Sequence, residues 1–363
     1  MNKTILTEKQ GICIVIMFIL SNAILGVRGI QAKEDFWVAL ILTIAITIFM
    51  SFILSKLYYT YPNKDLFDII EICFGRFIGK IFITLYVYFL LEEGTMVLMN
   101  FAYFTNLTYL DRTPLLVIKM FFLLLCLYTS KLGIYILGRC SEYFLIWVIP
   151  IIGFSIAFSI PDMDFNNIRP FFNTGVRPIM MGVLYAYTFP FGEIVTLSAV
   201  LSNLKERNSA YKIYISGTLI SGLILLLTSS TNILVLGVKV ASSTFYPTYI
   251  TMSKIQIGDA IQRIEIIMTL VYILSALIKT SVYLLATCKA IIKLFDFHDH
   301  SFLLTPTAFL MLNLSIFLTP NILAYWEYND KFWTYWSLFF LFIFPVILLI
   351  VSSIKEYKKI KFL

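Results

Sequence analysis

Long apolar runs recur along the chain and constrain its fold more than any other feature. Stretches of 18 or more predominantly apolar residues follow one another, and a helix needs about 20 such residues to cross a bilayer. The 363 residues are 60% hydrophobic and 13% charged, whereas soluble domains are about half apolar and a quarter charged. The sequence therefore predicts an all-α integral membrane protein.

The apolar runs predict ten transmembrane helices within a single transmembrane domain that covers residues 1–363. Two further segments have an amphipathic pattern: 64–75, between the second and third spans, and about 242–258, between the seventh and eighth. The ten predicted spans cover residues 10–31, 36–56, 78–104, 113–130, 133–158, 178–200, 211–233, 261–292, 301–320 and 333–353.

Lysine and arginine residues are distributed unevenly over the predicted loops. If both termini lie on one side, 17 of the 28 Lys and Arg residues fall on that side, 10 fall on the other, and Lys279 lies within a span. Because basic loops stay in the cytoplasm, both termini are expected there. The net charge of +7 follows from this bias, so it does not indicate nucleic acid. The basic C-terminal tail is expected to contact anionic lipid headgroups.

The first five predicted spans resemble the last five in their irregularities. The first span of each half is interrupted, by SNAILG at 21–26 and by FPFGE at 189–193, and the third span of each half is long and contains ionisable residues. Since five is an odd number, the second half has to enter the membrane from the opposite side. Inverted repeats of about 10–158 and 178–353, with broken first and sixth helices, are typical of a LeuT-like transporter fold.

The FPFGE stretch has a physical reason to break its helix. Pro190 has no N–H, so the carbonyl of Ala186 loses its helical partner, and Gly192 loosens the backbone further. An unsatisfied carbonyl costs several kcal/mol in hydrocarbon, so the break has to face protein or a polar cavity. A simple proline kink remains an alternative. Two observations favour one shared site instead. Insertion of a charged side chain such as Glu193 at mid-depth costs about 2.5–3.5 kcal/mol, and the first span has a matching break.

The interruption in the first span contains Ser21, Asn22 and Gly26. A half-helix that starts near Gly26 would present free N–H groups to an anion such as a carboxylate. The carbonyl end of the preceding half-helix would suit an ammonium group, so an α-amino acid is a suitable ligand. In the alternative interpretation, these small polar residues only pack helices together.

The third span carries Glu92 and Glu93 near its centre, followed by Met96. Neighbouring residues on a helix point about 100° apart, so one carboxylate can face a cavity while the other pairs elsewhere. Two interpretations stay open for these carboxylates. One is proton coupling, and the other is a structural hydrogen bond to the eighth or tenth span.

The eighth span contains Lys279 and Thr280 in the stretch ALIKTSVYL. Our hypothesis is that the Lys279 ammonium takes the place of a sodium ion between spans one and eight; the alternative is that it reaches the cytoplasmic surface. Arg139 and Glu142 are three positions apart on a helix, so they either complete this network or pair with each other. No metal site or cofactor is predicted, because His298 and His300 lack a third ligand nearby.

Several stretches resemble the spore germination permeases, which are the B subunits of GerA-type germinant receptors. FPFGEIVTLSAVLSNLK is similar to their sixth helix and LGRCSEYFLIWVIP to their fifth. The stretch TFYPTYITMSKIQIGDAIQRIEIIMTL and the lysine of SALIKTS are similar as well. The resemblance covers most of the chain and is strongest from 185 to 295. The first span departs from the family pattern, because the proline of the usual LPR ending is absent.

The resemblance implies an amino-acid carrier scaffold of the polyamine-organocation superfamily that senses germinants in the spore inner membrane. The implied partners are A and C subunits and a germinant such as an amino acid, a sugar or a nucleoside. A proton-coupled amino-acid transporter and a scaffold for partner subunits remain alternatives; an enzyme is least expected, because no catalytic motif is found. The implied pocket consists of Asn22, Ala23, Ile24, Leu25, Gly26, Thr188, Phe189, Pro190, Phe191, Gly192 and Glu193, flanked by Glu92, Glu93, Met96, Lys279 and Thr280.

Overall fold

The computed structural model describes residues 6–202, 204, 206, 208–255, 263–297 and 301–361. Within these residues every regular element is helical, and the extended contact is one isolated bridge between Leu6 and Leu204. The start of the span predicted at 261–292 and the two histidines, His298 and His300, lie outside the described residues.

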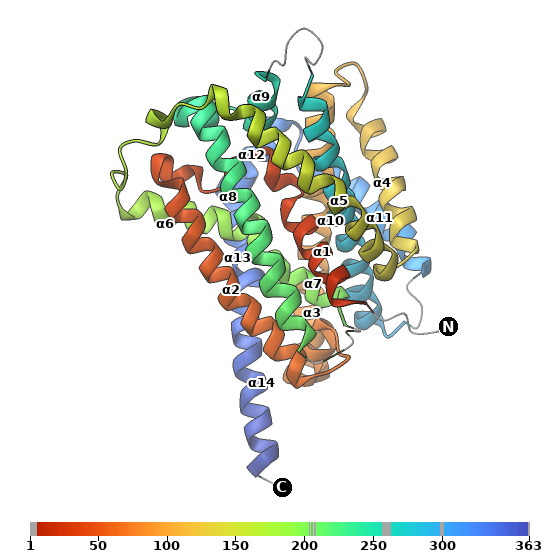
Figure 1. The fold of residues 1–363 in the computed structure, drawn as a ribbon. Helices are drawn as coiled ribbons and strands as arrows, with labels where there is room; N and C mark the ends of the chain where they lie inside the picture. The colour runs from red at the N-terminus through yellow and green to blue at the C-terminus, as the bar shows by residue number, and fades with distance from the viewer. Residues whose placement is uncertain are drawn as a thin grey trace.

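The helices form one elongated bundle in which α1 lies among its neighbours and α14 extends past the lower end (Figure 1). Some helices are joined end to end by single π-helical turns, which are wider than α-helical turns. These wide turns are Tyr187–Phe191, which follows α6, and Asn329–Trp333 and Phe339–Ile343, which link α12, α13 and α14. The α-helices are α1 Glu8–Leu20, α2 Phe36–Thr60, α3 Leu66–Thr108, α4 Leu115–Lys131, α5 Ile134–Ser159, α6 Val176–Ala186, α7 Ile194–Val200, α8 Ser209–Ser243, α9 Pro247–Ser253, α10 Glu265–Phe295, α11 Ser301–Phe317, α12 Ile322–Tyr328, α13 Thr334–Leu338 and α14 Phe344–Lys361.

The structure confirms the predicted class, a helical multi-pass membrane protein. Within the described residues, 7 helical segments are long and apolar enough to cross a membrane. The other three predicted spans correspond to α1, α4 and α11, which have 13, 17 and 17 residues. Because these three helices fall below the about 20 residues of a typical crossing, the number of ten crossings stays a prediction.

Burial separates the interior of the bundle from its periphery. The most apolar stretch of Val176–Val200, which contains the predicted sixth-span break, is 83% buried, whereas that of Ile134–Asp162 is only 28% buried. The broken segment is therefore enclosed by other helices, and α5 presents most of its apolar side chains outward. This difference is expected if lipid covers α5 and protein covers the irregular backbone.

Glycine residues with positive φ break two of the long helices. Gly75 in α3 has φ 79° and Gly237 in α8 has φ 72°, a region that L side chains rarely adopt. The amphipathic segment predicted at 64–75 is the part of α3 before Gly75. The segment predicted at about 242–258 contains α9, while α8 continues to Ser243 instead of ending at 233.

Close backbone approach between α1 and α8 depends on Gly217. A Cβ atom at this position would lie 2.5 Å from Cγ1 and 2.6 Å from Cβ of Val15. Lipid is as apolar as a leucine side chain, so membrane helices associate largely through tight packing of small residues such as this one. Val15 is β-branched and fully buried, and it therefore has little freedom to move aside.

Gly217→Ala is expected to lower the midpoint of thermal unfolding of the detergent-solubilised protein. The added methyl group overpacks the α1–α8 contact, which costs about 1–3 kcal/mol. Gly153→Ala in α5 is the matched control, because a Cβ there meets open space. The control is expected to leave the midpoint unchanged or to raise it slightly. Equal midpoints for the two variants would show that the α1–α8 contact tolerates a wider spacing.

Candidate ligand-binding site

The break in the first predicted span is confirmed. Helix α1 ends at Leu20, Ser21 has φ −3° and ψ −124°, and Asn22–Leu25 form a single 3-10 turn. The half-helix predicted to start near Gly26 is wrong. Gly26 is extended, Gly29 has φ 75°, and the chain forms a short 3-10 segment at Ile30–Asp35 before α2 begins. The N–H groups of a helix N-terminus therefore do not face this gap.

The break in the sixth predicted span is also confirmed. Helix α6 ends at Ala186, and Phe189 is extended with φ −139° and ψ 114°. Pro190 follows it, and α7 begins at Ile194. The N–H of Gly192 donates to the carbonyl of Tyr187 at 2.6 Å, which closes the wide turn. Most of the break is thus satisfied by its own backbone and enclosed by protein.

A cavity of about 370 Å³ lies between the two breaks and is closed by α3, by the segment from the end of α8 to the start of α9, and by α12 with the turn that follows it. This volume is within the range of small-molecule sites, about 300–1,000 Å³. Predicted site residues that line the cavity are Asn22, Leu25, Gly26, Glu93, Met96, Phe189 and Glu193. Lining residues that sequence reasoning missed include Arg28, Asn100, Tyr246, Tyr325, Trp326 and Trp333.

The remaining predicted pocket residues lie outside the cavity lining. The carbonyl of Ile24 accepts a hydrogen bond from Thr248 of α9 at 2.7 Å, and the hydroxyl of Thr188 donates to the carbonyl of Leu184 at 3.0 Å. The members of this group from the two broken spans shape the breaks with their backbones, whereas Glu92 lies in α3 and Lys279 and Thr280 lie in α10. The residues of this group are Ala23, Ile24, Glu92, Thr188, Pro190, Phe191, Gly192, Lys279 and Thr280.

Glu92 and Glu93 face different surroundings. The Glu92 carboxylate accepts hydrogen bonds from the hydroxyl of Tyr328 and, at 3.1 Å, from Nε1 of Trp336. Glu92 is therefore not part of the pocket, and its contact is the structural hydrogen bond to the tenth predicted span. Glu93 lies on the cavity side, where its Oε2 accepts from the hydroxyl of Tyr283 at 3.4 Å.

A buried ion pair joins Lys279 of α10 to Glu193 at the start of α7. The two side chains are 0% and 1% exposed, so Lys279 does not reach the cytoplasmic surface. Its ammonium group also lies 5.1 Å from the ring centre of Phe18 in α1 and 4.6 Å from that of Phe189. The lysine thus contacts both broken spans. Sequence reasoning singled out each residue but missed their pairing.

Arg139 and Glu142 do not join this network. Glu142 forms an ion pair with Lys9 at 2.6 Å, and the guanidinium of Arg139 lies 5.8 Å from the ring centre of Tyr135. Neither predicted alternative, a contact with Lys279 or a pair with each other, is observed. Arg139 is exposed on α5. The partner of Glu142, Lys9, lies on another helix, α1, so residue spacing within one helix does not predict this pair.

Several buried polar atoms at the cavity have no hydrogen-bond partner within the described protein. Such groups usually cost about 1–3 kcal/mol each when nothing satisfies them, and buried polar atoms without a partner are rare. A polar molecule in the cavity would be able to satisfy them. These atoms are Nε of Arg28, Oε1 of Gln31, Oε1 of Glu93, Oε1 of Glu193, the hydroxyl of Tyr246, and Nε1 of Trp326 and Trp333.

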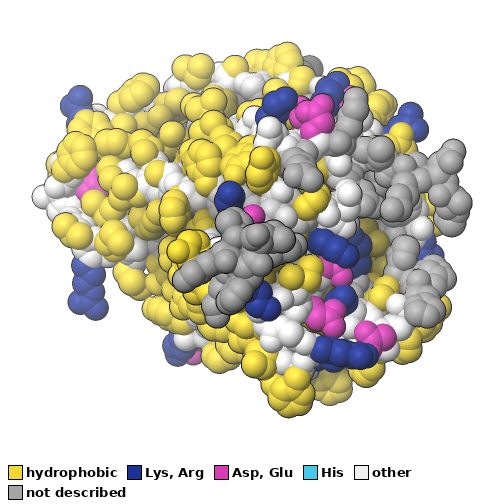
Figure 2. All heavy atoms as spheres, turned by 90° about the horizontal axis from the view of Figure 1, so that it is seen from below, with side chains coloured by type: hydrophobic (Ala, Val, Ile, Leu, Met, Phe, Trp, Pro, Cys, Tyr) yellow, Lys and Arg dark blue, Asp and Glu magenta, His cyan; other side chains and the backbone are white. Residues whose placement is uncertain are grey.

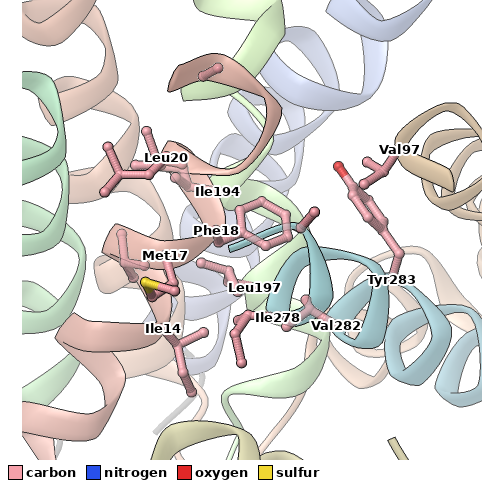
Figure 3. Close-up of a cluster of buried hydrophobic side chains, with 14 of the residues drawn as sticks. Ile14, Met17, Phe18, Leu20, Val97, Ile194, Leu197, Ile278, Val282 and Tyr283 are labelled. Atoms are coloured by element: carbon pink, nitrogen blue, oxygen red, sulfur yellow. The ribbon is translucent and has the colours of Figure 1, made fainter. Parts of the chain in front are cut away.

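A hydrophobic cluster adjoins the cavity where α1, α7 and α10 meet. Figure 3 shows Phe18 beside Leu197 and Ile278, with the ring of Tyr283 opposite. The Phe18 and Tyr283 ring centres are 5.4 Å apart. All four side chains are fully buried, so water does not reach this cluster.

Charged contacts tie α10 to α3 on the face seen from below, where basic and acidic side chains lie interspersed (Figure 2). Lys293 pairs with Asp68 at 2.8 Å and with Glu71 at 2.5 Å. At the end of α10, Asp296 accepts from Lys80 at 2.8 Å and from Arg76 at 2.9 Å. These hydrogen bonds lower the pKa of Asp296. The contacts hold this end of α10 against α3.

Comparison with solved structures identifies the fold. Mhp1, a nucleobase-cation-symport-1 family transporter in a closed conformation with bromovinylhydantoin bound, aligns with a TM-score of 0.71 at 11% identity, covering 95% of this chain and 77% of Mhp1. The inward-facing conformation of Mhp1 aligns with a TM-score of 0.59 at 13% identity, covering 93% of this chain and 76% of that one. This likeness confirms the predicted transporter fold with two broken helices.

Sequence comparison identifies the family. Spore germination protein KB of Bacillus subtilis (strain 168) is 27% identical over 99% of this chain and 98% of its own length. Spore germination protein A2 of the same organism is 24% identical over 96% of this chain and 95% of its own length. A family model described as "Spore germination protein" matches residues 5–323. The chain therefore belongs to the spore germination protein family, as the resemblance of its fifth and sixth helices predicted.

Proposed function

We propose that this chain is the germinant-sensing membrane subunit of a spore germination receptor and that it binds a small polar germinant in the cavity between its two broken helices. The family and the transporter fold support this function. The single observation that carries it is the group of unpartnered polar atoms on Arg28, Glu93 and Glu193 at this cavity. A site that served only to pack helices would be expected to satisfy these atoms internally.

Sensing requires two arrangements of the protein that bind the germinant with different affinity, because a ligand shifts an equilibrium only by that difference. The cavity is lined from both irregular segments and from α3 and α12. Closure of these elements around a ligand would change how α7 and α10 meet at the Glu193–Lys279 pair. In this proposal, that change is what partner subunits detect.

The proposed setting is the spore inner membrane, with both termini in the cytoplasm and with A and C subunits as partners. The bias of Lys and Arg residues toward one set of loops supports this orientation. Helix α14 extends past the lower end of the bundle (Figure 1), so its basic end lies on the side that the proposal assigns to the cytoplasm.

A proton-coupled amino-acid transporter is the second candidate. The similarity to the transporter Mhp1 and a buried carboxyl group at the cavity, Glu93, favour it. The two functions differ in one measurement, the uptake of a labelled ligand by the chain alone in proteoliposomes. Uptake that is driven by a pH gradient would favour the transporter, and binding without uptake would favour the sensor.

A thermal-shift screen of the purified protein against amino acids, sugars and nucleosides tests the proposed function. A true germinant is expected to raise the unfolding midpoint, because ligand that binds only the folded state stabilises it by mass action. The shift is expected to persist when choline replaces sodium, since in our hypothesis Lys279 supplies a fixed cation.

Gly26→Trp is the matched variant for this screen, because the indole would occupy the cavity. Gly153→Trp on the open face of α5 is its control. We expect the cavity variant to lose both the thermal shift and the germination response of spores, and the control to keep both. A normal germination response with Gly26→Trp would leave only a scaffold role.

A further inference from the structure

Buried charged side chains meet at one side of the cavity. Glu93, Glu193 and Lys279 are 1%, 1% and 0% exposed, and one ammonium group therefore serves two carboxyl groups. Glu193 forms the ion pair with Lys279, while Glu93 accepts a hydrogen bond from the neutral hydroxyl of Tyr283 at 3.4 Å. Two buried carboxylates that share one ammonium group cannot both stay ionised in a low-dielectric site without a further cation. Glu93 therefore needs either a proton or a second cationic group.

The surroundings of Glu93 contain no basic side chain bonded to it among the described residues. On its own helix, Glu92 turns away toward Tyr328, and α7 contributes Glu193. Helix α10 contributes Lys279, already paired with Glu193, and the neutral hydroxyl of Tyr283. The cavity that Glu93 lines also contains the phenol of Tyr325 in α12 and the guanidinium of Arg28, which lies over Phe189 at 5.1 Å.

One oxygen of each carboxyl group has no partner on the protein. Oε1 of Glu93 and Oε1 of Glu193 are buried without a hydrogen bond, and both residues line the cavity. A primary ammonium group donates three hydrogen bonds and so can satisfy both oxygens at once. Aromatic rings of Phe189, Tyr325 and Trp333 line the same cavity, and ring faces attract a cation.

Arg28 gives the cavity a second, opposite recognition element. Its Nε is buried without a partner, and its guanidinium lies 5.1 Å from the ring centre of Phe189. A guanidinium in this state suits a carboxylate, which accepts two parallel N–H bonds. A molecule with an ammonium group and a carboxylate would satisfy both ends of the site, whereas a sugar or a nucleoside would leave Glu93 and Arg28 without charged partners.

We infer that the ligand of this cavity is a small zwitterion whose ammonium group binds the Glu93 carboxylate and displaces a proton from it, while Arg28 binds its anionic group. The inference rests on the proposed function and specifies its ligand class. In the empty site Glu93 is a neutral carboxylic acid. When the ammonium arrives, the O–H bond of Glu93 breaks, the carboxylate keeps the electron pair, and the proton leaves to solvent.

The test is calorimetric titration of the purified protein with the twenty standard amino acids, glucose and inosine as probes, in two buffers of different ionisation enthalpy. We expect at least one amino acid to bind and to release close to one proton per molecule bound. Because proton and ligand compete, affinity is expected to rise by up to tenfold per pH unit wherever the empty site holds its proton.

Glu93→Gln and Glu92→Gln form a matched pair of adjacent variants. Glu93→Gln is expected to weaken binding at least tenfold and to abolish both the proton release and the pH dependence. Glu92→Gln loses a structural contact, so its unfolding midpoint falls, but its affinity is expected to stay within about threefold of the wild type. Unchanged proton release in Glu93→Gln would overturn the inference, because a merely structural role would leave that signal in place.

The outcomes separate this inference from the function on which it rests. Binding of glucose or inosine without binding of any amino acid would overturn the zwitterion and leave the sensing function standing. If no probe binds and Gly26→Trp spores germinate normally, the sensing function fails and the inference fails with it. Amino-acid binding without proton release would overturn the displacement step.

Discussion

Lys279→Met is expected to destabilise the protein by about 3–5 kcal/mol, because it leaves the Glu193 carboxylate buried without its counter-charge. The pair is 0% and 1% exposed, so water cannot compensate for the missing ammonium. The rings of Phe18 and Phe189 beside the lysine also lose their cation. The measurement is the midpoint of thermal unfolding in detergent, together with the yield of monodisperse protein.

The double variant Lys279→Met with Glu193→Gln is the decisive comparison. Removing both charges avoids an uncompensated buried ion, so the double variant is expected to be more stable than the single one. Lys331→Met is the control, because Lys331 pairs with Glu327 at 2.5 Å on an exposed surface, where such pairs contribute about 0–1 kcal/mol. A single variant as stable as the control would mean that Glu193 is not ionised in the folded protein.

The two breaks were predictable because their causes are local. Pro190 removes a donor from its own helix, and Gly192 and Gly26 loosen the backbone wherever they stand. The membrane class followed from apolar runs whose length the bilayer dictates. These features need no knowledge of which segments meet. They account for the agreement between the predicted fold class and the structure.

The contacts within the site were not predictable in the same way. Lys279 and Glu193 are 86 residues apart in the chain, and their pairing depends on how α7 packs against α10. Which of Glu92 and Glu93 faces the cavity depends on the rotation of α3, which a hydropathy pattern does not fix. Of the two Trp side chains of the cavity wall, Trp326 lies between two predicted spans and Trp333 is the first residue of the tenth, so hydropathy did not place either of them at the cavity.

The segment after Gly26 shows a different limit. Its composition suits a helix, yet Gly29 and Lys33 both adopt positive φ, at 75° and 50°. The chain here has to return to α2 while Arg28 points at the cavity, and tertiary contacts override local helix propensity. In the inferred site, the guanidinium of Arg28 takes the place of the anion site that was predicted at a helix N-terminus.

Gly26→Ala is expected to weaken ligand binding by about 10- to 150-fold, which corresponds to the 1.5–3 kcal/mol of a hydrogen bond to a charged group. The backbone at Gly26 is extended, with φ −121° and ψ 175°, so alanine introduces no backbone strain. Its Cβ, however, would lie 2.0 Å from Nη2 of Arg28. The guanidinium is the flexible end of a long side chain, so it moves away from the cavity while the fold is kept. Calorimetry measures the affinity, and the unfolding midpoint without ligand is expected to change little.

A double-mutant cycle with Arg28→Met assigns this loss to Arg28. In the Arg28→Met protein the guanidinium is already absent, so adding Gly26→Ala is expected to cause no further loss of affinity. Full additivity of the two losses would show that Gly26 acts through the cavity volume instead of through Arg28. Wild-type affinity in Gly26→Ala would show that the guanidinium has a second position from which it binds the ligand equally well. The cycle thus tests whether the Arg28 side chain has the anion-binding role that helix N-termini perform in other proteins. The backbone at Gly26 does not itself require glycine. Glycine is required there only if a Cβ atom would push the guanidinium of Arg28 out of its binding position.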